Sequence, residues 1–478
     1  MRIPGAIGPA YKLTNYPLDC QRCVNLYPEP DEMQTGKDGS IGSLIRTPGL
    51  TRKVTLPLGE VRGLYTVSFN GTVYAVGGNT LYKVDSSYAV TALGTLRTNT
   101  GAVSMSDNGQ QLIIVDGVSG YILNLNNSQF IEITSGSFYS SNRIAFQDGY
   151  FILAKPGTGK FYLSNTYDGL TYNGLNFATA EGSPDLLVSI LAFKNELILF
   201  GSQTIEVWYD TGNLSFPYTR IPGGLIEHGC AAPLSVSKSG DVILWLGQDE
   251  YGNGVVYKSI GMQPARASNY GVEDAIQKYS SISDATSFVY QDRGHTFYVL
   301  SFPTANATWV LDVDLGVWHE RSSLVSGAQG RWRANCHTFG YGVHLVGDFS
   351  DGRIYALDST NFTDDGATLR WLRSFPHIST NLKRASHFKF QIDALLGQGT
   401  DGTALGQNPT VMMRYSDDGG ASWSGEKWRP LGRLGHRKAR VLWRRLGSSR
   451  DRVYEISGSD PVDVALIGAD LDLIGMAS

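Results

Sequence analysis

A basic run near the C-terminal end holds the residues best suited to bind charged groups. Ten lysines and arginines fall between residues 426 and 452, where Glu426 and Asp451 are the only acidic residues. Guanidinium and ammonium groups pair with phosphates and carboxylates. The run could therefore contact a neighbouring subunit or passing DNA, or it could be a solvated face. Our candidate subunit or channel contacts in it are Arg433, Arg437, Arg440, Trp443, Arg444 and Arg445.

Two shorter clusters combine arginine with tryptophan. They are Arg331-Trp332-Arg333 and the stretch from Arg370 to Arg373. Both residue types are enriched at the energetic centres of protein interfaces. We therefore add Arg331, Trp332 and Arg333 as a second set of candidate contacts.

A turn motif directly precedes the basic run. Ser416, Asp418, Gly420, Ser422 and Trp423 fit the pattern Ser-x-Asp-x-Gly-x-Ser/Thr-Trp, which resembles the Asp-box found in the blades of many β-propellers. The aspartate can accept the backbone N–H groups that close the turn, the glycine allows a positive φ, and the tryptophan can pack under the hairpin. We interpret the motif as a folding device on a blade rim. Sialidase-like glycosidases also carry such boxes, so a sialidase-like or carbohydrate-binding propeller is the alternative function.

The remaining reactive side chains form no recognisable catalytic or metal-binding set. The eight histidines are scattered without an HExxH spacing, and no G-x-S-x-G elbow precedes a helix. Cys20 and Cys23 form a CxxC, but Cys230 and Cys336 are isolated, so a second zinc-binding pair is missing. We expect no catalytic residue, no metal, no cofactor and no small-molecule substrate, and we expect the thiols to be free and structural.

Composition indicates how these residues are positioned. The 478 residues include 56 glycines and 25 tyrosines, and only 18% are charged, which favours many short strands joined by tight turns. A chain of this length requires several domains or one repeated architecture. The net charge of −4 does not by itself indicate nucleic acid. No apolar run reaches the length of a signal peptide or a spanning helix, so we expect a soluble chain made in a cytoplasm.

From about residue 60 the chain repeats a unit of about 40–50 residues, each with several apolar runs separated by turn residues. Asn70-Gly71 and Asn108-Gly109 are strong hairpin signals. The second run of each unit is the most apolar, as expected of a strand buried on both faces. We predict an all-β fold containing a β-propeller of about seven blades, with six to eight possible. Two stacked sandwiches are the alternative architecture.

The repeats set the expected domain boundaries. Residues 1–58, broken by seven prolines, should form an extended N-terminal arm, and residues 59–379 should form the blades. Residues 380–456 should be the last blade or a small β-domain that carries the Asp-box. Residues 457–478 form an acidic and apolar C-terminal tail, which could add a strand to an early unit or to a neighbour.

Three N-terminal elements, RIPGAIGPAY, DCQRCVNLYPEP and GSLIRTPGL, occur together with the Asp-box and a late RKARVLWRRLG. This set, over nearly the full chain, resembles the packaged-DNA stabilisation proteins, or tail accessory factors, of short-tailed bacteriophages. The RCVNLYPE element followed by TPGL is its most specific part. The resemblance implies a non-enzymatic virion protein at the head-to-tail junction.

In that family role, six copies would form a ring below the portal-adaptor ring protein, close the channel on the packaged DNA, and hold the tail needle and the tailspikes. Double-stranded DNA would lie nearby without sequence-specific binding. The protein would reside in the virion tail and, during assembly, in the host cytoplasm. A closed ring needs two complementary patches on each subunit. The basic run and the acidic tail are one candidate pair.

Overall fold

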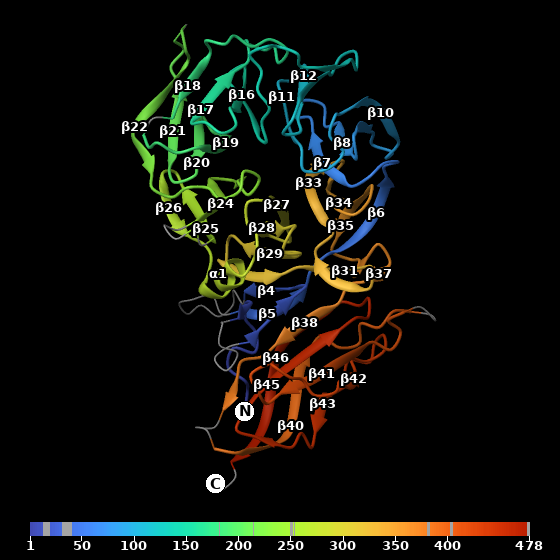
Figure 1. The fold of residues 1–478 in the computed structure, drawn as a ribbon. Helices are drawn as coiled ribbons and strands as arrows, with labels where there is room; N and C mark the ends of the chain where they lie inside the picture. Colours follow the sequence, from blue (N-terminus) through green and yellow to red (C-terminus); the bar gives the residue numbers. More distant parts are fainter. Residues whose placement is uncertain are drawn as a thin grey trace.

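The computed structural model describes residues 1–12, 20–30, 41–180, 182–213, 215–248, 252, 254–379, 383–401 and 405–475. Within them the chain forms a propeller of seven four-stranded blades and a β-sandwich beside it (Figure 1). One helix of eight residues, α1 (Tyr270–Gln277), joins the fifth and sixth blades. The predicted all-β propeller is confirmed, and the stacked-sandwich alternative for the repeats is wrong.

The blades follow one another along the chain, each with its first strand nearest the axis. The first three are β7 (Val61–Thr66), β8 (Val73–Gly77), β9 (Thr80–Val84) and β10 (Val90–Thr95); β11 (Ser104–Asp107), β12 (Gln111–Val115), β13 (Gly120–Asn124) and β14 (Phe130–Glu132); β15 (Ile144–Gln147), β16 (Tyr150–Ala154), β17 (Lys160–Leu163) and β18 (Phe177–Thr179). The next three are β19 (Leu187–Phe193), β20 (Glu196–Gly201), β21 (Ile205–Asp210) and β22 (Tyr218–Ile226); β23 (Ser237–Ser239), β24 (Val242–Gln248), β25 (Gly254–Ile260) and β26 (Gln263–Arg266); β27 (Thr286–Asp292), β28 (His295–Phe302), β29 (Ala307–Asp312) and β30 (Val317–Glu320).

The second strand of each blade is mostly buried, as its apolar sequence predicts. All five residues of β8 and all eight of β28 are buried. These strands lie between two neighbouring blades, so both of their faces are covered. The expected turn at Asn70-Gly71 places Gly71 at φ 66°, and Asn70 Oδ1 accepts the Thr72 N–H at 3.0 Å. Local sequence thus specifies each blade.

The seventh blade is completed by a strand from the other end of the sequence. Its strands β33 (Ala334–Gly340), β34 (Val343–Asp348) and β35 (Arg353–Asp358) are followed by β6 (Gly49–Thr55), which is antiparallel to β35. The short strands β36 (Thr363–Asp364) and β37 (Ala367–Thr368) extend this sheet. Residues 49–55, which we expected to belong to an extended arm, therefore close the ring.

The sandwich has two sheets, and N-terminal residues contribute to both. One sheet runs β4 (Leu26–Pro30), β5 (Ile41–Arg46), β46 (Ala465–Gly475), β40 (Ala385–Ala394) and β43 (Val441–Arg444). The other runs β3 (Cys23–Val24), β38 (Trp371–Ser374), β45 (Asp451–Gly458), β41 (Thr410–Ser416) and β42 (Lys427–Pro430). The proline-containing β4 is an edge strand, where a missing N–H donor is tolerated.

Short pairs of strands complete the described elements. They are β1 (Tyr11–Lys12) with β2 (Cys20–Gln21), β31 (Ser322–Val325) with β32 (Ala328–Arg331), β39 (Ile378–Ser379) on β45, and β44 (Ser448–Ser449) on β40. The expected arm also includes residues 13–19 and 31–40, which lie outside the described residues.

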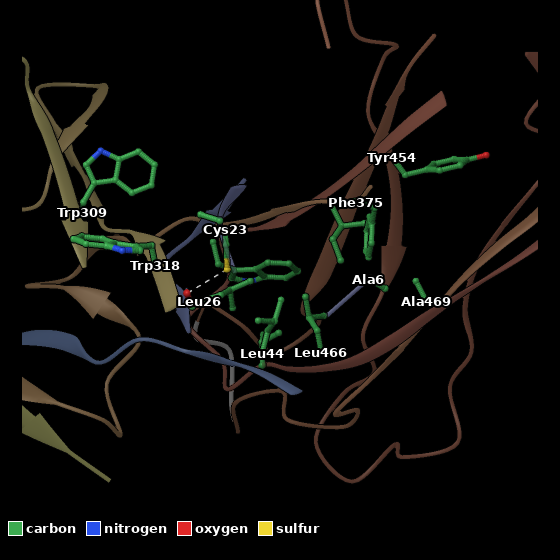
Figure 2. Packing of buried hydrophobic residues seen from close by; sticks show 14 of the residues in the cluster. Ala6, Cys23, Leu26, Leu44, Trp309, Trp318, Phe375, Tyr454, Leu466 and Ala469 are labelled. Atoms are coloured by element: carbon green, nitrogen blue, oxygen red, sulfur yellow. Dashed lines mark hydrogen bonds between the residues drawn. The ribbon is translucent and has the colours of Figure 1, made fainter. Parts of the chain in front are cut away.

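The propeller and the sandwich share one sheet and one core. Strand β3 pairs with β30 of the sixth blade on one side and with β38 of the sandwich on the other. Trp318 from the blade belongs to the same buried cluster as Leu26, Phe375 and Leu466 around the sandwich (Figure 2). The Cys23 thiol lies in this cluster and donates to the Leu26 carbonyl at 3.3 Å. The two domains are therefore packed as one body.

Arg46, a buried residue at the end of β5, forms hydrogen bonds with both domains. Its Nη1 donates to the carbonyls of Asp460 (2.6 Å) and Val462 (2.7 Å), and its Nη2 to those of Phe362 (3.1 Å) and Leu369 (2.5 Å). Burial lowers the pKa of Arg46 to about 10. One side chain thus satisfies four carbonyls, two beside the propeller and two in the sandwich.

Arg373 on β38 anchors the start of the chain in the same way. Its guanidinium donates to the carbonyls of Ala6 (3.1 Å), Pro9 (3.1 Å) and Gly5 (3.0 Å) and to Gln21 Oε1 (2.8 Å). Arg373 is completely buried. The Arg370–Arg373 cluster, which sequence suggested as a contact, holds the N-terminal segment in place instead.

Candidate interaction site

The two sheets of the sandwich end side by side at strands β42 and β43 (Figure 1). Arg429 Nε donates to the Leu442 carbonyl at 2.8 Å, and Trp443 Nε1 donates to the Lys427 carbonyl at 2.8 Å. These bonds fix the two edge strands to each other. We call β42, β43, the loop 431–440 between them and Arg445 the basic edge.

The basic edge presents eight exposed cations. Five of them, Arg433, Arg437, Arg440, Arg444 and Arg445, are candidates from the sequence, and the others are Lys427, Arg429 and Lys438. Ion pairs in the described part of the sandwich use other cations, such as Arg414 with Glu455 and Arg452 with Asp417. With no carboxylate of the described chain within ion-pair distance of these eight, their charge is available to a partner.

Apolar side chains are exposed at the same edge. Trp428 is 53% exposed and Leu434 is 60% exposed. Large apolar groups among cations are typical of protein-binding surfaces, where an aromatic anchor supplies most of the contact area. Sequence reasoning missed both residues, although Trp428 lies directly between two basic residues.

Four candidates from the sequence are buried, and we withdraw them as contacts. Trp443 is 1% exposed because it packs in the sandwich core. Trp332 is completely buried under the Arg321 guanidinium, which lies 3.8 Å from its ring centre. Arg333 pairs with buried Asp348 at 2.6 Å, and Arg331 lies 3.8 Å over the Phe349 ring. Trp332 belongs to a buried cluster that joins the sixth and seventh blades.

The Asp-box closes the hairpin between β41 and β42, in the sandwich and not on a blade rim. Ser416 Oγ donates to Asp418 Oδ1 (2.6 Å) and accepts the Gly420 N–H (2.8 Å). Asp418 also accepts the N–H and the hydroxyl of Ser422 at 2.8 and 2.5 Å. The Ser416 hydroxyl, followed by that of Ser422, lowers the pKa of Asp418 to about 2. The half-buried Trp423 ring lies 4.5 Å from the Arg414 guanidinium carbon. The Asp418 carboxylate and the hydroxyls of Ser416 and Ser422 are thus used by the turn.

A cavity of about 280 Å³ lies where the inner strands of the blades converge. The glycosidase alternative requires two facing carboxylates in such a pocket. The residues lining this cavity, all of them described, include no aspartate and no glutamate. The geometry therefore gives the glycosidase alternative no support.

Within the described ranges, no three histidine, cysteine, aspartate or glutamate side chains gather as a metal-binding group would require. Likewise, none of the described helical residues belongs to a helix long and apolar enough to cross a membrane. The described thiols of Cys23, Cys230 and Cys336 are free, and the Cys20 side chain lies outside the described residues.

Comparison with known proteins gives matches for both domains. A family model described as "Bacteriophage P22 Gp10, beta-propeller" matches residues 10–362, and one described as "Bacteriophage P22 Gp10, beta-sandwich" matches residues 370–473. The tail hub protein gp10 of Salmonella phage P22 is 23% identical over 291 residues, which cover 59% of this chain and 60% of that relative.

Among solved structures, two β-propeller domains are similar to this chain at low sequence identity. The Cps50 (Swd1) propeller domain of Myceliophteria_thermophila is 11% identical with a TM-score of 0.42, covering 64% of this chain and 98% of that one. The WD40 propeller domain of Doa1 is 13% identical with a TM-score of 0.40, covering 64% and 96%. We draw no functional argument from them.

Proposed function

This chain belongs to the Bacteriophage P22 Gp10 family, whose two domain models together match most of it, and from this premise we propose that it is a structural hub protein of a phage tail. The observation that carries the proposal is the match of both domains to that family, one of whose relatives is a tail hub protein. A hub acts by holding other virion proteins, which requires a rigid body with contact surfaces. The shared core of propeller and sandwich and the exposed basic edge supply these.

The proposed location is the head-to-tail junction of the virion, after assembly in the host cytoplasm. There the protein retains packaged double-stranded DNA by closing the portal channel, and it attaches to the portal-adaptor ring protein, the tail needle and the tailspikes. Its DNA contacts are not sequence-specific. These assignments rest on the family role, and they are consistent with a chain whose conspicuous polar residues serve folding or surface contact.

The proposed assembly is a hexameric ring in which the basic edge of one copy contacts an acidic propeller surface of the next. Residues 59–379 contain 19 lysines and arginines against 28 aspartates and glutamates, so the propeller has the opposite charge to the edge. The acidic tail no longer serves as the complementary patch. Its strand β46 pairs with β5 and β40 of its own chain, and Ala469 and Leu471 are buried.

The test is a charge reversal at the basic edge. Arg437→Glu, Arg440→Glu and Arg444→Glu combined should abolish ring formation, because like charges would then face each other. The matched control combines Lys53→Glu, Lys83→Glu and Lys194→Glu, three exposed lysines elsewhere on the protein, and should still assemble. Mass photometry gives the copy number, and negative-stain images of mixtures with a portal–adaptor complex show docking.

Two negative results would have different meanings, one for the subunit contact and one for the hub function. If the edge variant forms rings as well as the native protein, the basic edge is not the subunit contact. If the native chain neither forms rings nor docks on the portal–adaptor complex, the hub function itself is wrong.

A further inference from the structure

The axial cavity is positively charged although the propeller around it is acidic. Its walls come from β7, β11, β15, β27 and β33 and from residues beside them, and they include Arg62 and Arg143 but no acidic residue. Residues 59–379 as a whole contain 28 acidic side chains against 19 basic ones. Because arginines but no carboxylates line the cavity, the local potential there is positive in spite of the acidic surroundings.

The other titratable groups of the cavity wall do not supply an anion near neutral pH. Burial raises the pKa of the Cys336 thiol to about 12 and lowers the pKa of the His337 imidazole to about 3. Burial also raises the pKa of the Tyr65 phenol. All three groups are therefore uncharged, and the arginines are the charged groups of the wall.

Arg62 is fully used by the fold. Its guanidinium donates to the carbonyls of Gly101 (2.5 Å), Gly78 (2.9 Å) and Thr98 (2.8 Å) and to the Thr98 hydroxyl (2.8 Å). Asp116 and Glu60 are close enough to act on its charge. Arg62 therefore holds the loop after the first blade and has little capacity left for a ligand.

Arg143, just before β15, has no such set of partners. Its Nη2 donates to the Val236 carbonyl at 3.0 Å, and no carboxylate pairs with it among the described residues. Lys238 is the neighbouring cation, and its Nζ donates to the Ala192 carbonyl at 3.2 Å. Burial lowers the pKa of both groups, and the charge of Arg143 contributes to the shift of Lys238. Arg143 is thus a half-buried cation whose guanidinium donates to a backbone carbonyl, whereas the neighbouring Lys238 is exposed.

Hydroxyl groups line the same space. Ser104 Oγ accepts the Ile144 N–H at 3.3 Å, which leaves its proton free to be donated into the cavity. Thr286 also lines the cavity. A planar guanidinium with neighbouring hydroxyl donors is the arrangement that recognises tetrahedral oxyanions.

We propose that the axial cavity binds a small oxyanion of the phosphate class, held by Arg143 with the Ser104 hydroxyl as a further donor. The anion supplies the negative charge that the cavity wall lacks and balances the charge of the Arg143 guanidinium. Free phosphate and the phosphate group of a small phosphomonoester share this chemistry. The site is separate from the basic edge and does not depend on the hub function.

The test measures phosphate binding to the full chain by isothermal titration calorimetry, with chloride at equal ionic strength as the reference. The native protein should bind inorganic phosphate at one site. Arg143→Met should weaken binding about tenfold or more, the usual effect of losing a charge-assisted hydrogen bond. Arg97→Met is the matched control, because Arg97 is exposed and pairs with Glu132 on the rim. This variant should bind phosphate with the same affinity as the native protein.

Folding of Arg143→Met is checked by circular dichroism and thermal unfolding in chloride. If that variant does not fold, Arg143→Lys replaces it; it keeps the charge but loses the planar fork, and phosphate should bind it more weakly than the native protein. A nucleoside monophosphate in a parallel titration separates the two ligand sources: tighter binding than phosphate assigns the site to a phosphomonoester. Absence of phosphate-specific heat in the native protein, or equal affinity in the Arg143 variant, would overturn the proposal.

Discussion

Buried arginines do much of the structural work in this protein. Arg46 satisfies four carbonyls between the propeller and the sandwich, and Arg373 bonds three carbonyls of the N-terminal segment. A guanidinium has five N–H donors in a rigid plane, so a single side chain can join several loops at once. Such a residue looks like a surface cation in the sequence, yet its removal leaves several buried acceptors unpaired.

Arg46→Met should therefore be strongly destabilising. We expect the free energy of unfolding to fall by about 3–5 kcal/mol, since four hydrogen bonds from a buried guanidinium to carbonyls are lost. Urea denaturation followed by tryptophan fluorescence measures the change. Arg437→Met at the exposed basic edge is the control and should stay within about 0.5 kcal/mol of the native protein. Equal stability of the two variants would show that the hydrogen bonds of Arg46 do not stabilise the fold.

A second residue-level prediction concerns His295 on β28. Its Nδ1 lies 2.6 Å from Asp312 and its Nε2 lies 2.9 Å from Glu29 of β4. The bond to Asp312, aided by that to Glu29, raises the pKa of His295 to about 9. Because the folded-state pKa is above the ordinary value of about 6.5, the protonated histidine stabilises the fold below pH about 6.5. That contribution is lost as the pH rises through about 9.

His295→Gln should remove this dependence. The stability difference between the native protein and the variant should be largest at pH about 6 and should shrink towards pH about 9.5. Denaturation curves across this range test it, and a difference that stays constant with pH would contradict the assignment. The neutral, buried His319, whose pKa burial lowers to about 3, acts in the acid range and does not interfere.

At the scale of elements, the hairpin between β41 and β42 positions the basic edge. Asp418 closes its turn through bonds to Ser416 and Ser422, and β42 follows a few residues later. The turn is exposed, so its effect should be local and not global.

Asp418→Ala should thus speed amide hydrogen exchange at Ser422, because its N–H loses the bond to the Asp418 carboxylate. Exchange in the core strand β45 should be unaffected. Exchange mass spectrometry on the two proteins provides the measurement. Asp168→Ala, in a similar turn of the third blade where Asp168 accepts from Leu170 and Thr171, is the comparison variant. Unchanged exchange at the Asp418 turn would mean that other bonds hold it.

Elements of local origin could be predicted from the sequence, and elements of long-range origin could not. The apolar second strands and the Asn70-Gly71 turn depend on neighbouring residues, so their patterns are visible in the chain. The pairing of β6 with β35 joins segments far apart in sequence, and composition does not reveal it. Arg333 and Arg433 also look equivalent in sequence, but only the fold decides that one pairs with Asp348 inside and the other is exposed.

For the candidate site, sequence therefore located the basic edge but not the burial of Trp332 and Trp443 or the exposure of Trp428. A tryptophan among arginines fits either a core or an interface, because both bury its large apolar surface. The arginines of the axial cavity were not singled out either, since blade packing brings them together from strands of different repeats.

At the scale of the whole molecule, the propeller and the sandwich should unfold together. Residues of both domains share one buried cluster, and β3 links their sheets. Differential scanning calorimetry should show one transition whose calorimetric and van't Hoff enthalpies agree.

Leu466→Ala tests the same prediction, because Leu466 lies in the core that both domains share (Figure 2). It should lower the free energy of unfolding by about 2–5 kcal/mol and shift that single transition as a whole. Two resolved transitions, or a shift of one of them alone, would show that the domains are energetically independent.

The positions of β6 and β35 in the sequence determine when the propeller ring can close during translation. The ribosome makes it roughly 300 residues before β35, its partner in the seventh blade. At about 5–20 residues per second, β6 waits for about 15–60 s while six blades emerge. During that interval the ring is open and its last sheet has an unsatisfied edge. A longer interval gives nascent chains on one messenger more opportunity to exchange this strand, so fast translation between β6 and β35 should favour monomers that close upon themselves.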